Sequence, residues 1–289
     1  MKVVDRQGNE VIYNQGQNKL LKNLYGSVLG RSVLKVLTLP FISHIGGKVM
    51  DSSLSKVQIS SFIKNNNIDM SQYEEKDYHS YNDFFTRNIK EGKRIIDFDE
   101  NHLISPADSK VSYYKINENT HLLVKDTLYT IEELLEDKTI AKKYQGGICL
   151  VCRLAVDDYH HYHYIDSGTT LTYKYIQGKF HTVNPIANDY YPIYKQNTRS
   201  YSLLSTKNFG DVIYMEVGAL MVGKIVNLKK QSFEKGEEKG YFEFGGSTIV
   251  LLFEKDKVNI DQDIINNSLK NYETKVYMGE KIGVKFDNL

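Results

Sequence analysis

The chain has 289 residues, 41% of them hydrophobic and 25% charged, a balance that predicts a globular protein with a sizeable core. The formal net charge is +1 and no basic stripe interleaved with aromatic residues occurs, so nothing indicates a nucleic-acid partner. No charge-free apolar run reaches the roughly 18 residues of a membrane-spanning helix, so no such span is expected. The 22 tyrosines favour β structure, because strands accommodate tyrosine well.

The first 95 residues are expected to be mostly helical, behind a loose polar start at residues 1–19. The segment Leu20–Ile45 carries two apolar stripes at helical spacing, interrupted by basic residues and by Pro40, which would break a helix. The stripes are Leu20, Leu21, Leu24 and Val28, followed by Leu29, Val33, Val36 and Leu37. Such helices either pack on the protein's own core or lie on a bilayer with their basic residues at the headgroups. The sequence leaves both interpretations open.

Local signals mark two helix ends in this region. The asparagine run at residues 65–67 suits a helix stop, and Ser80 is a plausible N-cap with Asp83 in the first turn that follows. We therefore expect one helix to end near residue 66 and another to begin at residue 81.

After about residue 103 the pattern changes to short apolar and aromatic runs separated by Gly, Asn and Asp, which predicts strands. The main runs are KVSYYKI, HLLVK, GICLVCRLAV, LTYKYIQGKF, VIYMEVGALMVGKIVNL and STIVLLFEK. One helix is expected among them, TIEELLEDKTIAKKY, where Thr130 and Glu133 form a capping box. The predicted fold class is α+β, with a helical N-terminal part (1–95) followed by a β-rich domain (96–289).

The two cysteines, Cys149 and Cys152, have the C-x-x-C spacing of redox and zinc sites. Their neighbours are apolar, and residues three apart on a strand point to opposite faces. No second cysteine pair could complete a zinc site. We expect two buried, unreactive thiols and no metal site.

Polar residues interrupt the β-rich part at a few places. They are Asp108 in SPADSKV, His160, His161 and His163 in RLAVDDYHHYHY, and the Gly245-Gly246-Ser247-Thr248 run before an apolar strand. Glycines also punctuate MEVGALMVGKI. Taken singly, each feature suits a structural role, since an aspartate after proline is usually a turn residue.

Taken together, these residues indicate chemistry. An aspartate, a histidine and a serine are the components of a catalytic triad. Ser247 follows Gly246, and glycine permits the distorted backbone that attack by a neighbouring hydroxyl would require. Such an attack breaks the protein's own backbone rather than a substrate.

The order of these features resembles the phosphatidylserine decarboxylases, in particular the shorter bacterial proenzymes of that family. The similarity covers about residues 80–289 and is weaker in the helical part. The matching stretches are FFTRNIKEGKR, SPADSKV, RLAVDDYHHYH, VNPIA, NTR, MEVGALMVGKI, KGEEKGYFEFGGST and ETKVYMGEKIG. Each is weak alone, but the full set in this order is highly specific.

The resemblance implies that the chain cuts itself between Gly246 and Ser247, into a β subunit (1–246) and an α subunit (247–289). The serine hydroxyl attacks the glycine carbonyl, and the amide becomes an ester. A base then removes the serine α-proton, and elimination releases the upstream chain with a carboxylate end. The remaining dehydroalanine hydrolyses to a pyruvoyl group and ammonia.

The resemblance also assigns the histidines. His163 matches the family's base for maturation, Asp108 matches the carboxylate that orients it, and His160 is assigned to proton delivery during turnover. The pyruvoyl ketone would condense with the amine of phosphatidylserine, and the imine would hold the electron pair left by CO2, as pyridoxal does. Phosphatidylethanolamine is then released, with no metal or pyridoxal phosphate required.

The implied partners are phosphatidylserine, the cytoplasmic face of the cell membrane as a peripheral contact, and the two cleaved subunits themselves. Two alternatives remain. One is a pyruvoyl decarboxylase of a soluble amino acid derivative, which would share these motifs. The other is a non-catalytic β-rich binding module, which would not cleave its own backbone.

Four positions depart from the family pattern. Ser109 replaces a usual glycine, Val156 a proline, His161 an arginine, and Thr198 an acidic residue. A glycine at 109 would tolerate positive φ, so the serine is expected to strain or reshape the turn beside Asp108.

Overall fold

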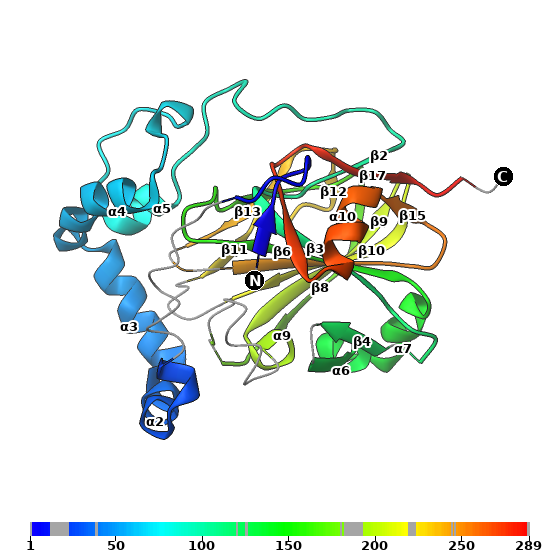
Figure 1. Ribbon diagram of the computed structural model, residues 1–289, viewed down its shortest axis with the longest axis horizontal. Helices are drawn as coiled ribbons and strands as arrows, with labels where there is room; N and C mark the ends of the chain where they lie inside the picture. Colours follow the sequence, from blue (N-terminus) through cyan, green and yellow to red (C-terminus); the bar gives the residue numbers. More distant parts are fainter. Residues whose placement is uncertain are drawn as a thin grey trace.

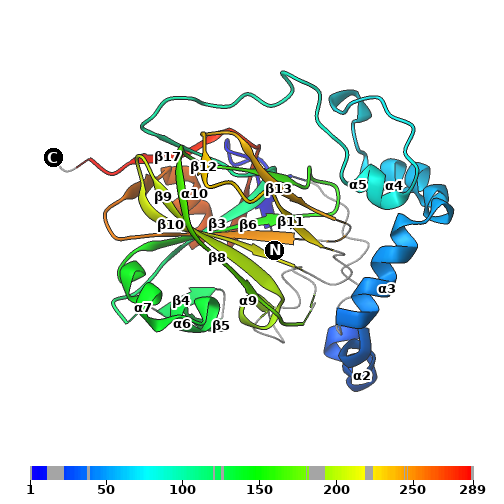
Figure 2. The ribbon, with the colours of Figure 1, turned by 180° about the vertical axis from the view of Figure 1, so that it is seen from behind.

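The computed structural model describes residues 2–11, 23–37, 40–119, 121–124, 127–179, 181, 193–218, 224–243, 245 and 247–287. Helices predominate before residue 86 and strands after residue 101, so the predicted α+β class is confirmed. The early helices run along one side of the β structure (Figures 1 and 2). Among the described residues, no helix is both long enough and apolar enough to cross a membrane.

The helical part has its own small core and defined ends. Its elements are α2 (Val28–Leu37), α3 (Pro40–Asp51), η1 (Ser53–Gln58), α4 (Ile59–Asn66), η2 (Met70–Gln72) and α5 (Tyr81–Phe85). Asn67 adopts a left-handed conformation and ends α4, and the Ser80 side chain accepts from the Asp83 N–H and caps α5. Both predicted helix ends are confirmed.

A nine-stranded sheet forms the centre of the described structure, in the order β1-β16-β3-β6-β14-β10-β9-β8-β12. Its strands are β1 (Lys2–Val4), β16 (Tyr272–Val276), β3 (Ser109–Lys115), β6 (Ile148–Leu154), β14 (Ser247–Phe253), β10 (Gly210–Val217), β9 (Arg199–Thr206), β8 (Gly168–Ile176) and β12 (Ser232–Phe233). The β1–β16 pair is parallel, and the other neighbours are antiparallel.

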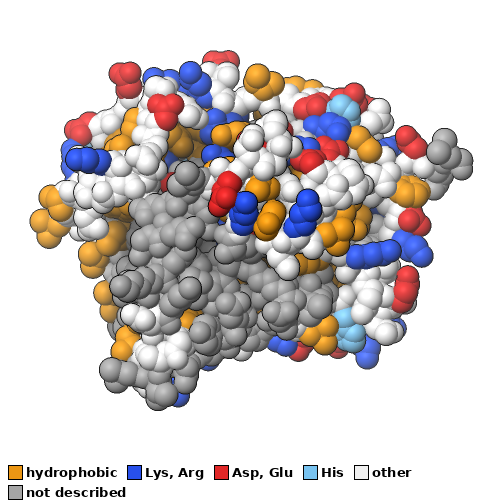
Figure 3. Space-filling model, viewed as in Figure 1, with side chains coloured by type: hydrophobic (Ala, Val, Ile, Leu, Met, Phe, Trp, Pro, Cys, Tyr) orange, Lys and Arg blue, Asp and Glu red, His pale blue; other side chains and the backbone are white. Residues whose placement is uncertain are grey.

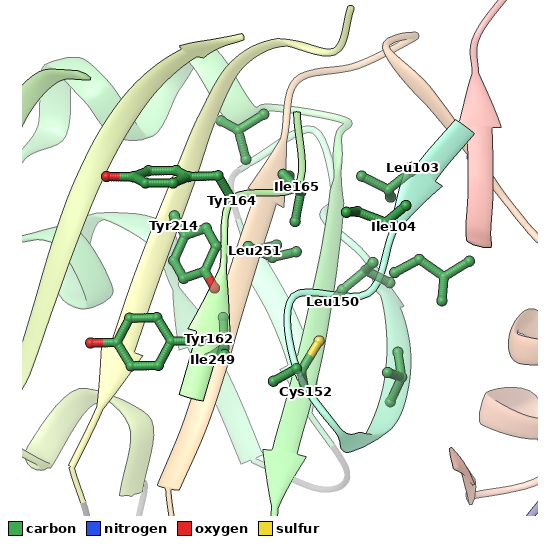
Figure 4. Packing of buried hydrophobic residues seen from close by; sticks show 14 of the residues in the cluster. Leu103, Ile104, Leu150, Cys152, Tyr162, Tyr164, Ile165, Tyr214, Ile249 and Leu251 are labelled. Atoms are coloured by element: carbon green, nitrogen blue, oxygen red, sulfur yellow. The ribbon is translucent and has the colours of Figure 1, made fainter. Parts of the chain in front are cut away.

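Strand β14 lies near the middle of this sheet, and all seven of its residues are buried. Because side chains alternate along a strand, Ile249 and Leu251 enter one apolar cluster while Val250 and Leu252 enter another. Figure 4 shows the cluster that contains Ile249 and Leu251. A core thus lies on each face of the sheet, and β14 is held by both.

The two cysteines of β6 follow the same alternation. Cys149 belongs to one cluster and Cys152 to the other, and both thiols are free and buried. Burial raises the pKa of Cys149 and raises that of Cys152 to about 12, so both stay protonated. The prediction of buried, unreactive thiols is confirmed.

Smaller elements surround the large sheet. One three-stranded sheet contains β11 (Ile225–Asn227), β13 (Glu238–Phe242) and β7 (His161–His163), and a second contains β15 (Val258–Ile260), β17 (Lys281–Lys285) and β2 (His102–Ile104). Strands β4 (His121–Val124) and β5 (Thr127–Thr130) form a hairpin, and the helices are α6 (Ile131–Leu135), α7 (Lys138–Ala141), η3 (Lys142–Tyr144), α9 (Ile193–Gln196) and α10 (Gln262–Leu269). The β13–β7 pair joins the strand before the candidate cleavage site to the histidine strand.

Two local predictions are wrong. The expected single helix after Thr130 breaks at Glu136, whose φ is +48°, and the Asp137 side chain caps the new helix α7; the capping box at Thr130 is present as predicted. The supposedly loose N-terminus contains β1, because Val3 and Val4 are buried beside β16. The division of the chain at residue 95 stays a prediction.

Candidate active site

Ser247 is the first residue of β14 and is fully buried. It lies opposite Leu154 of β6, and the next residue, Thr248, lies opposite Val217 of β10, so strands on both sides hold the start of β14. Gly245 has a φ of +132°, a conformation that favours glycine. Gly246, and with it the geometry of the predicted scissile bond, lies outside the described residues.

His160 is the histidine that contacts Ser247. Its Nδ1 lies 3.2 Å from the serine Oγ, and its Nε2 lies 2.9 Å from the Ala155 carbonyl oxygen. A carbonyl oxygen only accepts hydrogen bonds, so Nε2 carries the proton and Nδ1 accepts from the serine hydroxyl. Burial, and then the positive charge of Arg87, lowers the pKa of His160 well below 6.5. The imidazole is therefore neutral and oriented to take a proton from Ser247.

The turn that carries the Ala155 carbonyl is itself held by a buried ion pair. The Asp158 carboxylate accepts from the Ala155 N–H at 2.7 Å and pairs with Lys110 Nζ at 2.5 Å. The His160 ring is thus oriented by a backbone carbonyl whose turn is fixed by Asp158.

Asp108 is buried just before β3 but pairs with an arginine. Its carboxylate accepts from Arg94 Nε at 2.8 Å and from the Met278 N–H at 2.9 Å. His163 donates its backbone N–H to the Pro106 carbonyl at 2.8 Å, yet its Nδ1 has no hydrogen-bond partner among the described residues. Burial lowers the pKa of His163 to about 4. No hydrogen bond joins Asp108 to His163, or His163 to Ser247, in this part of the chain.

The structure thus brings two of the four predicted residues, Ser247 and His160, into direct contact. The ring centroid of Phe85 lies 4.1 Å from that of His160. The sequence did not predict roles for Phe85, Arg94, the Ala155 carbonyl or the Lys110–Asp158 pair. A carbonyl has no sequence signature. Phe85 and Arg94, however, both lie in FFTRNIKEGKR, whose match to the family could have marked them.

The four residues that depart from the family pattern make ordinary structural contacts. Ser109 begins β3 and is not among the described non-glycine residues with positive φ, so the expected strain there is absent. Thr198 Oγ1 accepts from the Gly178 N–H at 3.0 Å. His161 pairs with Glu238 at 2.9 Å and stacks on Tyr159. Val156 is half-buried in the turn after β6.

Within the described residues, no cluster of His, Cys, Asp or Glu could hold a metal ion.

Comparison with known proteins identifies the family of the chain. Residues 81–284 match the family model described as phosphatidylserine decarboxylase. The chain is 47% identical to phosphatidylserine decarboxylase proenzyme 2 of Clostridium acetobutylicum, over 97% of each chain. It is 46% identical to the phosphatidylserine decarboxylase proenzyme of Clostridium tetani, over 93% of this chain and 92% of that one. For the proenzyme of Fusobacterium nucleatum the identity is 44%, over 91% and 90%.

The buried serine and histidine behind a glycine turn, together with these similarities, place the protein among the decarboxylases made as proenzymes. The chain belongs to the phosphatidylserine decarboxylase family.

Proposed function

We propose that this protein cuts its own backbone at Gly246–Ser247 and then decarboxylates phosphatidylserine to phosphatidylethanolamine. Family membership supports the reaction class. The observation that carries the proposal for this chain is the contact between the buried Ser247 hydroxyl and the neutral Nδ1 of His160.

Self-cleavage has two steps that each need a base, and two histidines are available. In the first, Ser247 Oγ attacks the Gly246 carbonyl carbon; the C–N bond breaks, the hydroxyl proton passes to a base, and the nitrogen is reprotonated. In the second, a base takes the serine α-proton, the Cβ–O bond breaks, and the upstream chain leaves as a carboxylate. We assign the base of the first step to His160, which contacts Oγ, and keep His163 for the second step.

After elimination, water converts the dehydroalanine to a pyruvoyl group and releases ammonia. Such a group supplies an electron sink for the pair left by departing CO2. The surroundings of Ser247 fit it, since the residue is fully buried and His160 lies beside it with its Nε2 proton held by Ala155. Burial keeps bulk water away from the reacting atoms, apart from the molecule that the hydrolysis consumes, and His160 can return a proton to the product.

Intact-mass measurement tests the cleavage. The wild-type chain should appear as two fragments, with the smaller one blocked to N-terminal sequencing, while Ser247→Ala should remain one chain. A wild-type chain that stays whole through purification and incubation would refute the proposal.

Hydroxylamine separates the two histidines, because it cleaves esters and leaves amides intact. His163→Ala should accumulate a full-length chain that hydroxylamine splits, since the ester forms but cannot eliminate. His160→Ala should accumulate a chain that resists hydroxylamine. The opposite pattern would exchange the two roles. For any variant that still cleaves, CO2 release per cleaved enzyme shows whether turnover is also impaired.

We also propose that the helical part lies on the cytoplasmic face of the membrane, where the lipid substrate resides. Figure 3 shows hydrophobic side chains at the edge of the molecule formed by this part. Val49 of α3 and Leu54 and Val57 of η1 are 52%, 81% and 82% exposed, and the exposed Lys48 and Lys56 lie among them. Exposed apolar residues beside lysines suit an anionic bilayer surface.

The predicted membrane segment Leu20–Ile45 is only partly described. Leu20 and Leu21 lie outside the described residues, and Leu34 is buried in a core cluster, whereas Val33 and Ile45 are 45% and 44% exposed. The proposed surface therefore centres on α3 and η1.

Sedimentation with anionic liposomes tests this surface. Leu54→Asp with Val57→Asp should reduce pelleting at least tenfold and leave self-cleavage unchanged. Leu269→Asp is the matched control, because this residue of α10 is 76% exposed but far from the helical part (Figure 1). Unchanged pelleting of the double variant would refute the lipid-binding surface, and activity on a soluble serine derivative would then favour a soluble substrate.

A further inference from the structure

The proposed cut divides the fold into two chains that share its sheets. The α subunit (247–289) contains β14, β15, α10, β16 and β17, and its strands pair with strands of the β subunit in two sheets. In the uncut chain, β14 is joined covalently at both ends. The cut leaves only its C-terminal connection, to the segment from β15 to β17 (258–285), which we call the C-terminal arm. Contacts that hold this arm therefore help to keep the start of β14 in the site.

The first residues of the chain add a strand to the C-terminal arm. Strand β1 pairs in parallel with β16, with Lys2 opposite Tyr272 and Val4 opposite Thr274. Val3 and Val4 are 1% and 2% exposed. Figure 1 shows the N-terminal strand, in blue, beside the orange and red elements of the arm. Because β1 is the last strand at this end of the described sheet, its removal would leave β16 with an unpaired edge.

A tight turn after β1 presents Arg6 to the arm. The Asp5 carboxylate accepts from the backbone N–H groups of Gln7 and Asn9, at 3.0 and 2.8 Å. The Gly8 N–H donates to the Asp5 carbonyl at 3.1 Å, and Gly8 has a φ of +86°, which favours glycine. Since these bonds are all local, the turn orients Arg6 without help from the rest of the fold.

The Arg6 guanidinium donates to acceptors in the α subunit. Its Nε and Nη2 donate to the two carboxylate oxygens of Asp263 at 2.5 and 2.9 Å, and Nη2 also donates to Asp261 at 2.8 Å. Its Nη1 donates to the Lys281 carbonyl at 2.7 Å and to Glu280 at 3.4 Å. The Arg6 side chain is only 19% exposed. A bidentate arginine–carboxylate contact of this kind is stronger and more directional than an exposed ion pair.

We propose that residues 2–11, the N-terminal clasp, retain the α subunit after cleavage, with Arg6 as the main polar contact. The clasp belongs to the β subunit, whereas the three carboxylates that Arg6 contacts belong to the α subunit. It is thus a noncovalent link between the two ends of the chain that remains when the backbone between Gly246 and Ser247 is cut. This inference rests on the proposed self-cleavage, but not on which histidine assists it.

The experiment uses cleaved protein immobilised through a tag at the C-terminus of the α subunit, and measures the rate at which urea removes the β subunit. Arg6→Gln should raise this rate by about tenfold, because truncating one partner of a hydrogen-bonded charge pair acts mainly on dissociation. Deletion of residues 2–11 should raise it further. Association should weaken without being abolished, since β3 and the buried Arg153–Glu273 ion pair hold the other side of β16.

Two controls separate release of a subunit from unfolding. The uncut Ser247→Ala chain with the same change sets the urea concentration, which is the highest at which that chain stays folded. Lys281→Met is the matched control, because Lys281 pairs with Asp261 at 2.6 Å inside the α subunit and its side chain is 33% exposed. It removes a cation from the same acidic group without crossing the cut, so its β subunit should leave at close to the wild-type rate.

Wild-type rates of loss for both Arg6→Gln and the deletion would overturn the inference. Equally fast loss from Lys281→Met would also overturn it, because the effect would not need a contact across the cut. Each variant should cleave completely, and a folded clasp variant that stays uncut would contradict a role confined to retention. A wild-type chain that stays whole by intact mass would show instead that self-cleavage fails. The two failures are distinguishable, because one is read from the masses and the other from the rate of separation.

Discussion

The helices between residues 40 and 85 leave more apolar side chains exposed than the large sheet does. Every residue of β14 is buried between two core clusters, whereas Leu54 and Val57 of η1 are more than four-fifths exposed. The helical part nevertheless has its own core, around Phe84 and Tyr81. The sheet therefore fixes the position of Ser247. The helical part leaves apolar side chains exposed to solvent and packs Phe85 against His160.

The largest expected effect on stability lies beside the sheet. Lys239 and Glu216 are both fully buried and pair at 2.5 Å, linking β13 to β10. Lys239→Met leaves the Glu216 charge unpaired and should lower the free energy of unfolding by about 3–5 kcal/mol. Urea denaturation in the uncleaved Ser247→Ala background measures this, because a single chain gives a simpler transition.

Two further variants make that measurement specific. Replacing Lys239 and Glu216 together by methionine and leucine should recover most of the loss, since no buried charge remains. Lys207→Met breaks an ion pair with Glu100 whose side chains are 58% and 68% exposed, and should change stability very little. If Lys239→Met and Lys207→Met lowered the free energy of unfolding equally, the contrast between core and surface would be contradicted.

Lowering the pH should have an intermediate effect on the free energy of unfolding. An unfolded histidine has a pKa near 6.5, whereas burial lowers that of His163 to about 4, so the unfolded chain takes up the proton first as pH falls. His163 should therefore remove about 2 kcal/mol of stability between pH 7 and pH 5. Adding His163→Gln to Ser247→Ala should reduce the pH-dependent loss of stability by this amount. If the free energy of unfolding depended on pH in the same way with and without His163→Gln, His163 would not be buried in its neutral form.

The smallest effect compares two helix caps. Ser80 caps α5 and Thr130 caps α6, each by accepting from a backbone N–H, at 3.1 and 3.0 Å. Ser80→Ala and Thr130→Ala should each cost about 1 kcal/mol. Only Ser80→Ala should slow self-cleavage, because α5 carries Phe85, whose ring packs against that of His160. Equal cleavage rates at equal loss of stability would weaken the link between the helical part and the site.

Sequence alone determined the features that depend on near neighbours. The caps at Ser80 and Thr130, the end of α4 and the buried strand at β14 follow from local hydrogen bonds and side-chain alternation, which a short stretch of chain contains. The candidate site residues were identified through the order of their motifs. Their roles were not testable from that order, because a motif does not state distances.

Tertiary structure decided which of these residues meet. His160 and His163 are three positions apart, and only the packing of their loop against β14 and α5 places His160, rather than His163, against Ser247. Asp108 lies beside Arg94 because β3 and the segment before it fold together. The N-terminal β1 forms only because β16, far along the chain, offers it an edge. Contacts between distant segments depend on the whole chain packing at once, and no local pattern contains that information.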